Sequence, residues 1–337
     1  MNWTSIVARA RGLSSHLLQE GTLCAIEDCA TLRELVIRLT ECRYLTEERS
    51  DTIVGAREIE LACRRVAADR LAILERWALD DPEMLLPFTL AEDVRSLRAL
   101  IRGATAGVAA DLRLVGLIAT RMLPVRALSH LASLANVAAM RALLASWRHP
   151  LADALDSNAD GARLDVLTIE CRLLNRWGQA SLHAARRVGA PRSIEAYVAD
   201  AIDLANATTA RILASQRAEL PGSDLFVTGG RVITRDDVLS AATRRGIGAL
   251  ARRVHARRPG SAIDVALSSD PRRLEEEILV ARIADARERT REDVLDAGVI
   301  ALFLLRLRAE QERIIRAAWS CELGLRPRSV REPRVAA

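Results

Sequence analysis

The chain has 337 residues, of which 49 are basic and 44 acidic, so its formal net charge at pH 7 is +5. Every basic residue is an arginine, which excludes chemistry that needs a lysine, such as a Schiff base or a Walker-type phosphate loop. Half of the residues are hydrophobic but only 3% are aromatic, and Ala, Leu, Arg and Glu dominate, as is typical of a helical protein.

The first part of the chain predicts three helices. A short amphipathic helix covers residues 3–17. Thr31 and Glu34 have the spacing of a capping box and predict the start of a second helix. A third, longer helix covers residues 55–79 and is ended by Asp80-Asp81-Pro82. Because each helix has one apolar face, each must pack against another element.

The stretch 89–150 has the pattern of a folding unit of three helices. The first begins at a capping box formed by Thr89 and Glu92. The second begins near Pro124 and the third after Asn136, a favourable N-cap residue. Nothing inside this unit is large enough to cover all three apolar faces. The unit therefore needs neighbouring elements, as the units of a repeat protein do.

The second half begins after a polar segment at 156–161, the clearest candidate for a boundary. Capping boxes at Thr234 with Asp237 and at Thr290 with Asp293 mark two helix starts. Helices are predicted over 164–188, 194–212, 238–254 (a broken pair), 275–288 and 299–321. The breaks divide the chain into helical repeat 1 (1–92), the core of helical repeat 2 (93–160), a long helix with helical repeat 3 (161–270), and closing helices with a basic tail (271–337).

Cysteines and apolar runs bear on the cellular compartment. None of the six cysteines forms a C-x-x-C pair, and each falls where a small apolar residue fits a helix, which predicts buried free thiols in a reducing cytosol. Arg9 and Arg11 precede any apolar segment, so we expect no signal peptide. The longest apolar run, 297–305, is less than half of the roughly 20 residues that a membrane span needs. We expect that the chain itself does not cross a membrane.

Three patterns could indicate catalysis, and each has a simpler interpretation. The acids of Asp80-Asp81 and Asp236-Asp237 could serve a metal-dependent helical enzyme, but the first pair ends a helix and the second suits a helix N-terminus. Gly229-Gly230-Arg231 lacks the strand and the Lys-Ser/Thr of a phosphate loop, which favours a turn. The five histidines have no partner at metal-ligand spacing and are interpreted as surface or boundary residues. We predict no catalytic residue, cofactor or metal site.

The most basic stretch of the chain lies between residues 231 and 258. Nucleic acid attracts such charge, but no aromatic residue is interleaved for base stacking and no known binding module is present. A solvated helix face is the simplest interpretation, while an acidic protein partner or an anionic headgroup surface would also fit. The eight arginines concerned are Arg231, Arg235, Arg244, Arg245, Arg252, Arg253, Arg257 and Arg258.

An internal repeat organises the whole sequence. Residues 30–44 align without a gap on 135–149, an offset of 105 residues, and 247–258 form a looser third copy about 110 residues later. A helix precedes each copy, at 6–12, 93–103 and 203–214, and long helices at 55–79, 163–188 and 271–289 join the copies. This pattern predicts an all-α fold with three pseudo-repeated helical lobes around a pseudo-threefold axis.

These repeats resemble the C/d (AC39-like) subunit family of rotary V-type and A-type ATPases, over the whole chain. The family opens with an aromatic-led helix that ends in an arginine-containing turn, which corresponds here to Trp3, Arg9 and Arg11. A leucine-rich element follows, which corresponds here to Leu32, Glu34, Leu35, Leu39, Thr40 and Tyr44. Its inner repeat helix has an acid with an arginine eight or nine positions later, as in Asp93 with Arg102 and Asp203 with Arg211. Its closing helix corresponds to Glu310, Ile314, Ile315 and Arg316, followed by Gly324-Leu325.

The resemblance implies a funnel-shaped, pseudo-threefold socket with a non-catalytic role. Such a protein is a central-stalk subunit that links the rotor shaft of the ATPase head to the membrane proteolipid ring, for ion or proton transport coupled to ATP hydrolysis or synthesis. It is a peripheral, single-copy component on the cytoplasmic side of a membrane complex, and it binds neither nucleic acid nor a small-molecule substrate. The alternatives are a helical-repeat scaffold or a nucleic-acid-binding protein outside any ATPase, and then a helical metal-dependent enzyme.

Candidate contact residues follow from the repeats. If the lobes surround a common axis, Arg11, Arg102 and Arg211 should point toward it. Either the arginines pair with the acid of their own repeat, Asp93 or Asp203, or some stay available for acidic groups of the rotor tip, and the internal pairing is favoured because an unpaired buried charge is costly. The candidates for partner binding or for pairing between lobes are Arg11, Asp93, Arg102, Asp203, Arg211, Glu310 and Arg316.

Overall fold

The computed structural model describes residues 3–50, 52–156, 166–216, 225–241, 244–270, 273–292 and 295–325. All regular secondary structure in these ranges is helical, which confirms the predicted all-α class. The basic tail and most of the predicted boundary at 156–161 lie outside these ranges. In chain order the helices are α1 (Trp3–Ser14), α2 (Glu20–Glu27), α3 (Leu32–Glu41), α4 (Glu47–Ser50), α5 (Ala56–Trp77), η1 (Pro82–Met84), α6 (Leu86–Thr105), α7 (Ala110–Arg113), α8 (Val125–Ser133), α9 (Val137–Ser146), η2 (Ala152–Leu155), α10 (Val166–Arg187), α11 (Arg192–Gln216), α12 (Arg235–Ser240), α13 (Arg244–Arg257), α14 (Ala262–Ser268), α15 (Leu274–Glu292) and α16 (Gly298–Glu322).

Several helices begin where the capping residues predict. The Thr31 hydroxyl accepts a hydrogen bond from the Glu34 amide at the start of α3, and the Asn136 side chain accepts one from Ala139 at the start of α9. Thr234 and Asp237 form a complete capping box before α12. Local side-chain signals therefore fix these helix starts.

Two predicted helix starts are wrong. Thr89 lies inside α6, where its hydroxyl donates to the Leu85 carbonyl, because Pro87 in the first turn already starts the helix. Thr290 lies near the end of α15 and donates to the Ala286 carbonyl, while Asp293 is outside the described residues. The boundary drawn between 92 and 93 falls within α6. The short helix α14, capped by Ser261, was not predicted.

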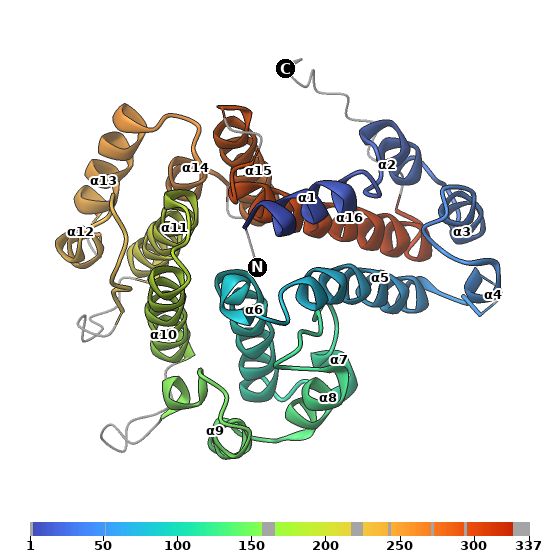
Figure 1. Ribbon diagram of the computed structural model, residues 1–337, viewed down its shortest axis with the longest axis horizontal. Helices are drawn as coiled ribbons and strands as arrows, with labels where there is room; N and C mark the ends of the chain where they lie inside the picture. The colour runs from blue at the N-terminus through green and yellow to red at the C-terminus, as the bar shows by residue number, and fades with distance from the viewer. Residues whose placement is uncertain are drawn as a thin grey trace.

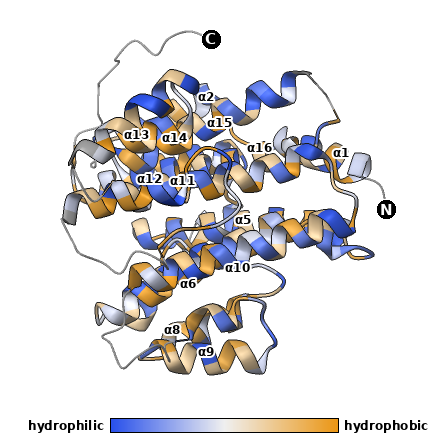
Figure 2. Ribbon diagram, turned by 90° about the vertical axis from the view of Figure 1, so that its left-hand side faces the viewer, coloured by the Kyte–Doolittle hydropathy of each residue, from blue (hydrophilic) through white to orange (hydrophobic). Residues whose placement is uncertain are grey.

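The helices form three groups around α6, α11 and α16 (Figure 1). α16 packs on α5, α2 and α3, which lie on the right of the view. α6 carries α7 and α8, with α9 beside them, and α11 carries α12, α13 and α14 on the left. α10 lies alongside α6 across the middle of the molecule, with α8 and α9 below them (Figure 2). The long helices α6, α11 and α16 are thus each associated with one set of short helices.

Three clusters of buried apolar side chains hold these groups together. The largest joins α6, α8 and α9 to α10 to α14, the second joins α1 and α5 to the start of α16, and the third joins α2, α3 and the start of α5 to the end of α16. α16 contributes to two of these clusters, and its Phe303 and Ile314 are fully buried. The apolar faces predicted from helical spacing are therefore covered by elements that are distant in sequence.

The first two repeats share an unusual backbone turn. Arg43 and Arg148, 105 residues apart, both have positive φ angles, 58° and 55°. In both copies the next amide donates to a carbonyl five residues back, Tyr44 to Leu39 and His149 to Leu144, each at 2.9 Å. This is the Schellman end of a helix, which usually has glycine at the left-handed position. The two copies therefore match in conformation as well as in sequence.

A buried carboxylate links each group's long helix to the loop before its short helices. On α6, Asp93 accepts a hydrogen bond from the Thr120 hydroxyl (2.6 Å), in the loop before α8. On α11, Asp203 accepts from the amides of residues 231–233 (2.7 to 3.0 Å), in the loop before α12. On α16, Glu310 accepts from the amide of Leu18 (2.5 Å), in the loop before α2. The three carboxylates, at most 1% exposed, are called the anchor carboxylates below.

The anchor carboxylates correct one part of the predicted repeat. The sequence suggested that α1 is the inner helix of the first copy, with Arg11 at its end. Instead, Glu310 of the closing helix makes the contact that Asp93 and Asp203 make in the other two groups. The first group is therefore completed by a helix from the other end of the chain, which a search for consecutive repeats does not detect.

Candidate functional site

A cavity of about 460 Å³ lies between α6, α10, α11, α15 and α16. Apolar side chains from all five helices line it, among them Trp177, Leu204, Ile278 and Leu304. Charged side chains lie mainly along α6 and extend to the neighbouring helices. The charged lining residues are Glu92, Arg95, Arg98, Arg102, Glu170, Glu275, Arg282 and Arg308. We call this space the central cavity because the long helices of all three groups contribute to its wall.

One carboxylate of the wall holds two arginines. Glu170 of α10, whose side chain is 3% exposed, accepts hydrogen bonds from Nη2 of Arg98 (2.8 Å) and Nη2 of Arg102 (2.7 Å), and a third from Nε of Arg102. The hydrogen bond to Glu170 is the main reason why the pKa of Arg102 lies above its ordinary value. The Nε atom of Arg98 is buried and has no acceptor among the described residues. These three residues are called the Glu170 triad.

A second carboxylate of the wall has the same arrangement. Glu92 of α6 accepts hydrogen bonds from Nε of Arg95 (3.1 Å) and from Nη2 of Arg308 of α16. Burial alone would raise the pKa of Glu92, but the two guanidinium groups outweigh it and hold the pKa below its ordinary value. Burial, and then the charge of Arg308, lower the pKa of Arg95. These three residues are called the Glu92 triad.

Positive charge exceeds negative charge in the wall of the central cavity. The lining contains five arginines and three glutamates. Glu312, which does not line the cavity, acts on Arg95 and Arg308 through its charge, although burial raises its own pKa. Each triad by itself has two guanidinium groups for one carboxylate. The wall can therefore accept further carboxylate or phosphate oxygens without losing its own ion pairs.

The arginines predicted to meet at a common axis do not come together. Arg11 is exposed on α1 and does not line the central cavity. Arg102 lines the cavity, but it pairs with Glu170 and not with Asp93. Arg211 donates to the carbonyls of Ala266 (3.0 Å) and Ser269 at the end of α14, and not to Asp203. The predicted pairing with the acid of the same repeat is therefore wrong for both Arg102 and Arg211. For the first pair the reason is helix geometry, since nine residues at 100° per residue place Asp93 and Arg102 on opposite sides of α6.

The predicted acids and the last arginine have partners elsewhere. Asp93 and Asp203 hold the loops described above, and Glu310 additionally pairs with Arg70 of α5. Burial raises the pKa of Asp93 and that of Glu310. Arg316 pairs with Glu276 of α15 (2.8 Å), so it joins two closing helices. The predicted role of these residues in pairing between elements thus has specific partners, while their role in binding a partner protein stays a prediction.

One histidine was misjudged from the sequence. His149 is 5% exposed rather than superficial, and its Nε2 lies 3.2 Å from the Asp93 carboxylate. Its Nδ1 accepts a hydrogen bond from the Leu151 amide (3.2 Å), so the proton of the neutral ring lies on Nε2 and is donated to Asp93. His149 therefore stabilises an anchor carboxylate and is not part of the cavity.

Of the residues in the two triads, the sequence predicted only Arg102 as a contact residue, and it assigned Glu92 to a capping box. Arg95, Arg98 and Arg102 are three and four residues apart, which places them on one face of a helix, and this signal was available. Glu170 and Arg308 carry no such signal, because their partners on α6 are 68 or more residues away in the chain.

Two of the arginines of 231–258 form ion pairs with acids of the chain. Arg253 pairs with Asp237 (2.5 Å) and Arg258 with Asp200 (3.0 Å). Four others, Arg231, Arg235, Arg252 and Arg257, are exposed, and the side chains of Arg244 and Arg245 lie outside the described part.

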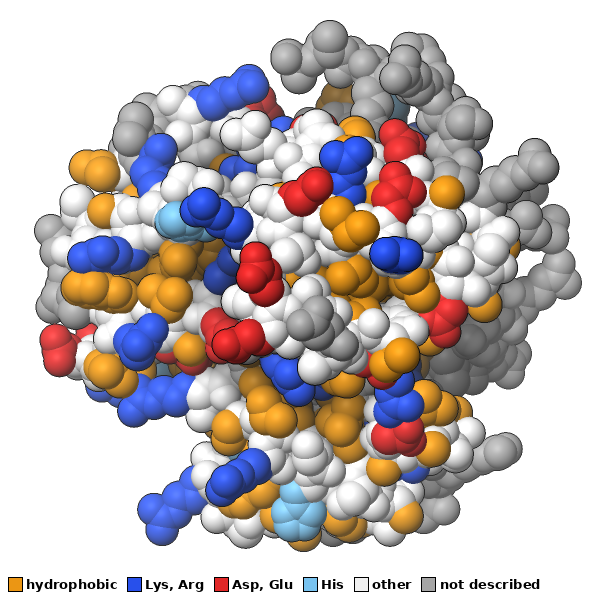
Figure 3. All heavy atoms as spheres, turned by 90° about the vertical axis from the view of Figure 1, so that its right-hand side faces the viewer, with side chains coloured by type: hydrophobic (Ala, Val, Ile, Leu, Met, Phe, Trp, Pro, Cys, Tyr) orange, Lys and Arg blue, Asp and Glu red, His pale blue; other side chains and the backbone are white. Residues whose placement is uncertain are grey.

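On the face that includes α3 and α4, acidic, basic and apolar side chains are interspersed (Figure 3).

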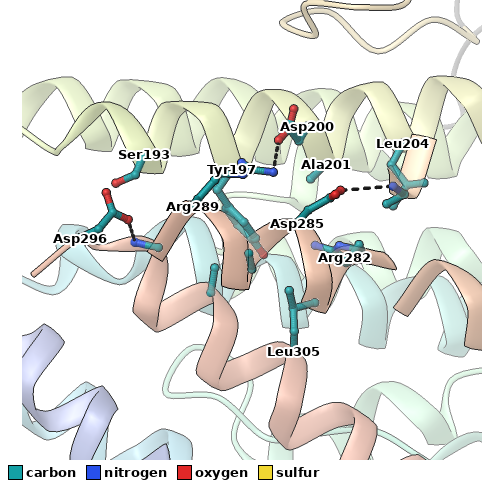
Figure 4. A pocket seen from close by; sticks show the side chains of 14 residues that line it. Ser193, Tyr197, Asp200, Ala201, Leu204, Arg282, Asp285, Arg289, Asp296 and Leu305 are labelled. Atoms are coloured by element: carbon teal, nitrogen blue, oxygen red, sulfur yellow. Dashed lines mark hydrogen bonds and ion pairs between the residues drawn. The ribbon is translucent and has the colours of Figure 1, made fainter. Parts of the chain in front are cut away.

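A second, smaller pocket of about 50 Å³ lies between α11, α14, α15 and α16 (Figure 4). All three of its carboxylates already have partners. Asp200 pairs with Arg289 (2.5 Å), Asp285 accepts from the Ala262 amide (3.2 Å), and Asp296 accepts from the Gly298 amide (2.5 Å). The first two contacts join α15 to α11 and to the start of α14, so we assign this pocket to stability.

Within the described ranges, none of the helices combines the length and apolarity that crossing a membrane requires. A search of curated proteins finds no match to this chain. The model of one family, described as ATP synthase (C/AC39) subunit, matches residues 6–332, nearly the whole chain. A match of this extent shows that the chain belongs to the ATP synthase C/AC39 subunit family and is thereby a V/A-type ATP synthase subunit.

Proposed function

We propose that this protein is the central-stalk coupling subunit of a V/A-type ATPase, seated between the rotor shaft and the proteolipid ring, and that its central cavity receives the shaft. The observation that carries this proposal is the cavity that the long helices of all three groups share, in a chain that belongs to the C/AC39 family. We further propose that the three groups are the lobes of a pseudo-threefold funnel. The anchor carboxylates support this, since each group uses the same kind of contact.

A coupling subunit must transmit torque without deforming, and ion pairs connect the closing helix α16 to its neighbours. Glu310 binds Arg70 of α5, and Arg308 binds Glu92 of α6. Arg313 binds both carboxylates of α2, Glu20 (2.8 Å) and Glu27 (2.6 Å). These ion pairs, all at least partly buried on one side, connect α16 to three helices in different directions. These contacts lie at residues 308–313 of a 25-residue helix that extends over roughly 37 Å, so a load on the helix is passed to three neighbouring helices.

The proposed position at the membrane is peripheral, on the side that carries the ATPase head. The chain would contact the ring through protein surfaces and headgroups instead of spanning the bilayer, and it would itself hydrolyse nothing. The coupling role needs mechanical contacts at both ends, and the family assignment supports it by implying a place within an ATP synthase complex.

Binding to the rotor shaft tests the proposal. The purified chain is titrated with the purified shaft subunits of the V/A-type ATPase from the same source, and complex formation is measured by calorimetry and by size-exclusion chromatography with light scattering. We expect a one-to-one complex at micromolar concentration or below. Absence of a complex at all salt concentrations would refute the coupling role.

A further inference from the structure

We infer that the element entering the central cavity is the end of a single α-helix that carries carboxylates spaced one turn apart, and that Glu170 and Glu92 hold four arginines in position to receive it. This inference deepens the proposed function and rests on it in one respect, namely that the occupant belongs to the rotor shaft. The chemistry of the occupant is derived from the cavity itself.

The charge of the wall requires an anionic occupant. The Glu170 triad has two guanidinium groups for one carboxylate, and the whole lining has five arginines for three glutamates, while Glu312 offsets part of the charge of the Glu92 triad. When a partner fills the cavity, water is expelled and an excess positive charge becomes costly unless an anion accompanies the partner. The buried Nε of Arg98 has no acceptor among the described residues. It can therefore donate a hydrogen bond to an anionic group of the occupant.

The geometry of the arginines indicates how the anionic groups are spaced. Arg98 and Arg102 are four residues apart on α6, so their side chains lie one helical turn apart on the same face. Arg102 uses Nε and Nη2 on Glu170, yet its side chain remains 56% exposed. Carboxylates at positions i and i+4 of an entering helix have the same one-turn spacing and can bind both arginines at once.

The size and apolar lining indicate one helix end. One turn of an α-helix with its side chains occupies roughly 400–600 Å³, given a pitch of 5.4 Å and a diameter of about 10–12 Å. The cavity of about 460 Å³ is of the same order as one such turn. The wall also contains apolar side chains, among them Leu204 of α11, Ile278 of α15 and Leu304 of α16. The entering turn therefore needs apolar side chains beside its carboxylates.

The experiment measures the affinity of the full-length chain for the shaft subunits as a function of salt. The test variant combines Arg98→Gln with Arg102→Gln. The matched control combines Arg252→Gln with Arg257→Gln, which removes the same charge from exposed positions on α13, outside the cavity. Because Arg102 is more than half exposed, the single Arg102→Gln variant keeps the fold if the double variant does not, and melting curves verify folding.

We expect the cavity variant to bind on the order of 10- to 100-fold more weakly, with a shallower dependence of the dissociation constant on salt, and the control to bind like the parent chain. Replacing the carboxylates of the shaft's terminal turn by amides should cause the same loss, with no further loss when both partners are changed.

Other results overturn the inference in distinguishable ways. If the parent chain binds the shaft and the cavity variant binds equally well, or if the control is weakened as much, the inference falls while the coupling role stands. If the parent chain does not bind the shaft, both fall. If millimolar ATP or inorganic phosphate raises the melting temperature of the parent chain but not of the cavity variant, and blocks the shaft, the occupant is a small anion and the helix-end assignment is wrong.

Discussion

The anchor carboxylate of α11 gives the sharpest test of how the fold is held. Asp203 is fully buried and accepts three backbone hydrogen bonds, one on Oδ1 and two on Oδ2, from residues 231–233. An asparagine keeps one acceptor oxygen and turns an amino group toward a backbone donor. At about 1.5–3 kcal/mol for each hydrogen bond to a charged group, plus the cost of an unsatisfied buried amide, we expect Asp203→Asn to lower the free energy of unfolding by about 3–5 kcal/mol.

The assay is urea denaturation followed by circular dichroism, together with a thermal melt in which we expect a decrease of roughly 4–7 °C. Asp236→Asn, at an exposed position on α12, is the control and should stay within about 0.5 kcal/mol of the parent. Gly230 gives an independent test, because a Cβ there would lie 2.3 Å from Oδ1 of Asp203. Gly230→Ala should therefore destabilise through the same carboxylate and combine with Asp203→Asn less than additively. A loss below about 1 kcal/mol for Asp203→Asn would refute the anchoring role.

Four further outcomes are expected. Arg148→Gly should stabilise the chain by about 1 kcal/mol in urea denaturation, because glycine adopts the left-handed turn without the penalty of a Cβ, and a loss of stability would contradict this. Glu170→Gln should destabilise by about 2 kcal/mol, less than the full cost of breaking a buried pair because both arginines are partly exposed; a change below about 0.5 kcal/mol in a thermal or urea melt would show that the carboxylate is dispensable. Because the pKa of Glu92 is lowered in the folded state, its stabilising effect relative to Glu92→Gln should be complete above about pH 4.3, the pKa of an unperturbed glutamate. The effect should fade as the pH falls through the folded pKa, and a stability difference between the two chains that grows toward acid pH would contradict this. The isolated chain should show no binding or hydrolysis of ATP in calorimetry and phosphate-release assays, and micromolar affinity would contradict the non-catalytic role.

Features that depend on nearby residues were predictable from the sequence. The caps at Thr31, Asn136 and Thr234 place three helix starts correctly, since capping is a contact between a side chain and an amide three residues away. The same signal failed at Thr89, where a proline upstream had already begun the helix. The 105-residue repeat could also be recognised, because a helix that ends in a Schellman turn requires a similar sequence pattern in each copy.

Features that depend on docking between distant helices were not predictable. Arg102 could be singled out as a repeated arginine, but its partner Glu170 is fixed only when α10 packs along α6. Likewise, Glu310 of α16 binds the amide of Leu18, which lies 292 residues earlier in the chain. The sequence pattern therefore indicated α1 with Arg11, and not α16, as the inner helix of the first copy. The cavity is formed by five helices, and the arginine spacing on α6 indicates one charged helix face but not the four helices that enclose it.

Ion transport by the assembled machine tests the coupling role most directly. The V/A-type ATPase is reconstituted in vesicles with and without this chain, and ATP hydrolysis and ATP-driven ion uptake are recorded together. The coupling role predicts that without the chain hydrolysis by the head continues while ion uptake falls to background, and that adding the chain back restores uptake. Ion uptake that proceeds equally well without the chain would contradict it.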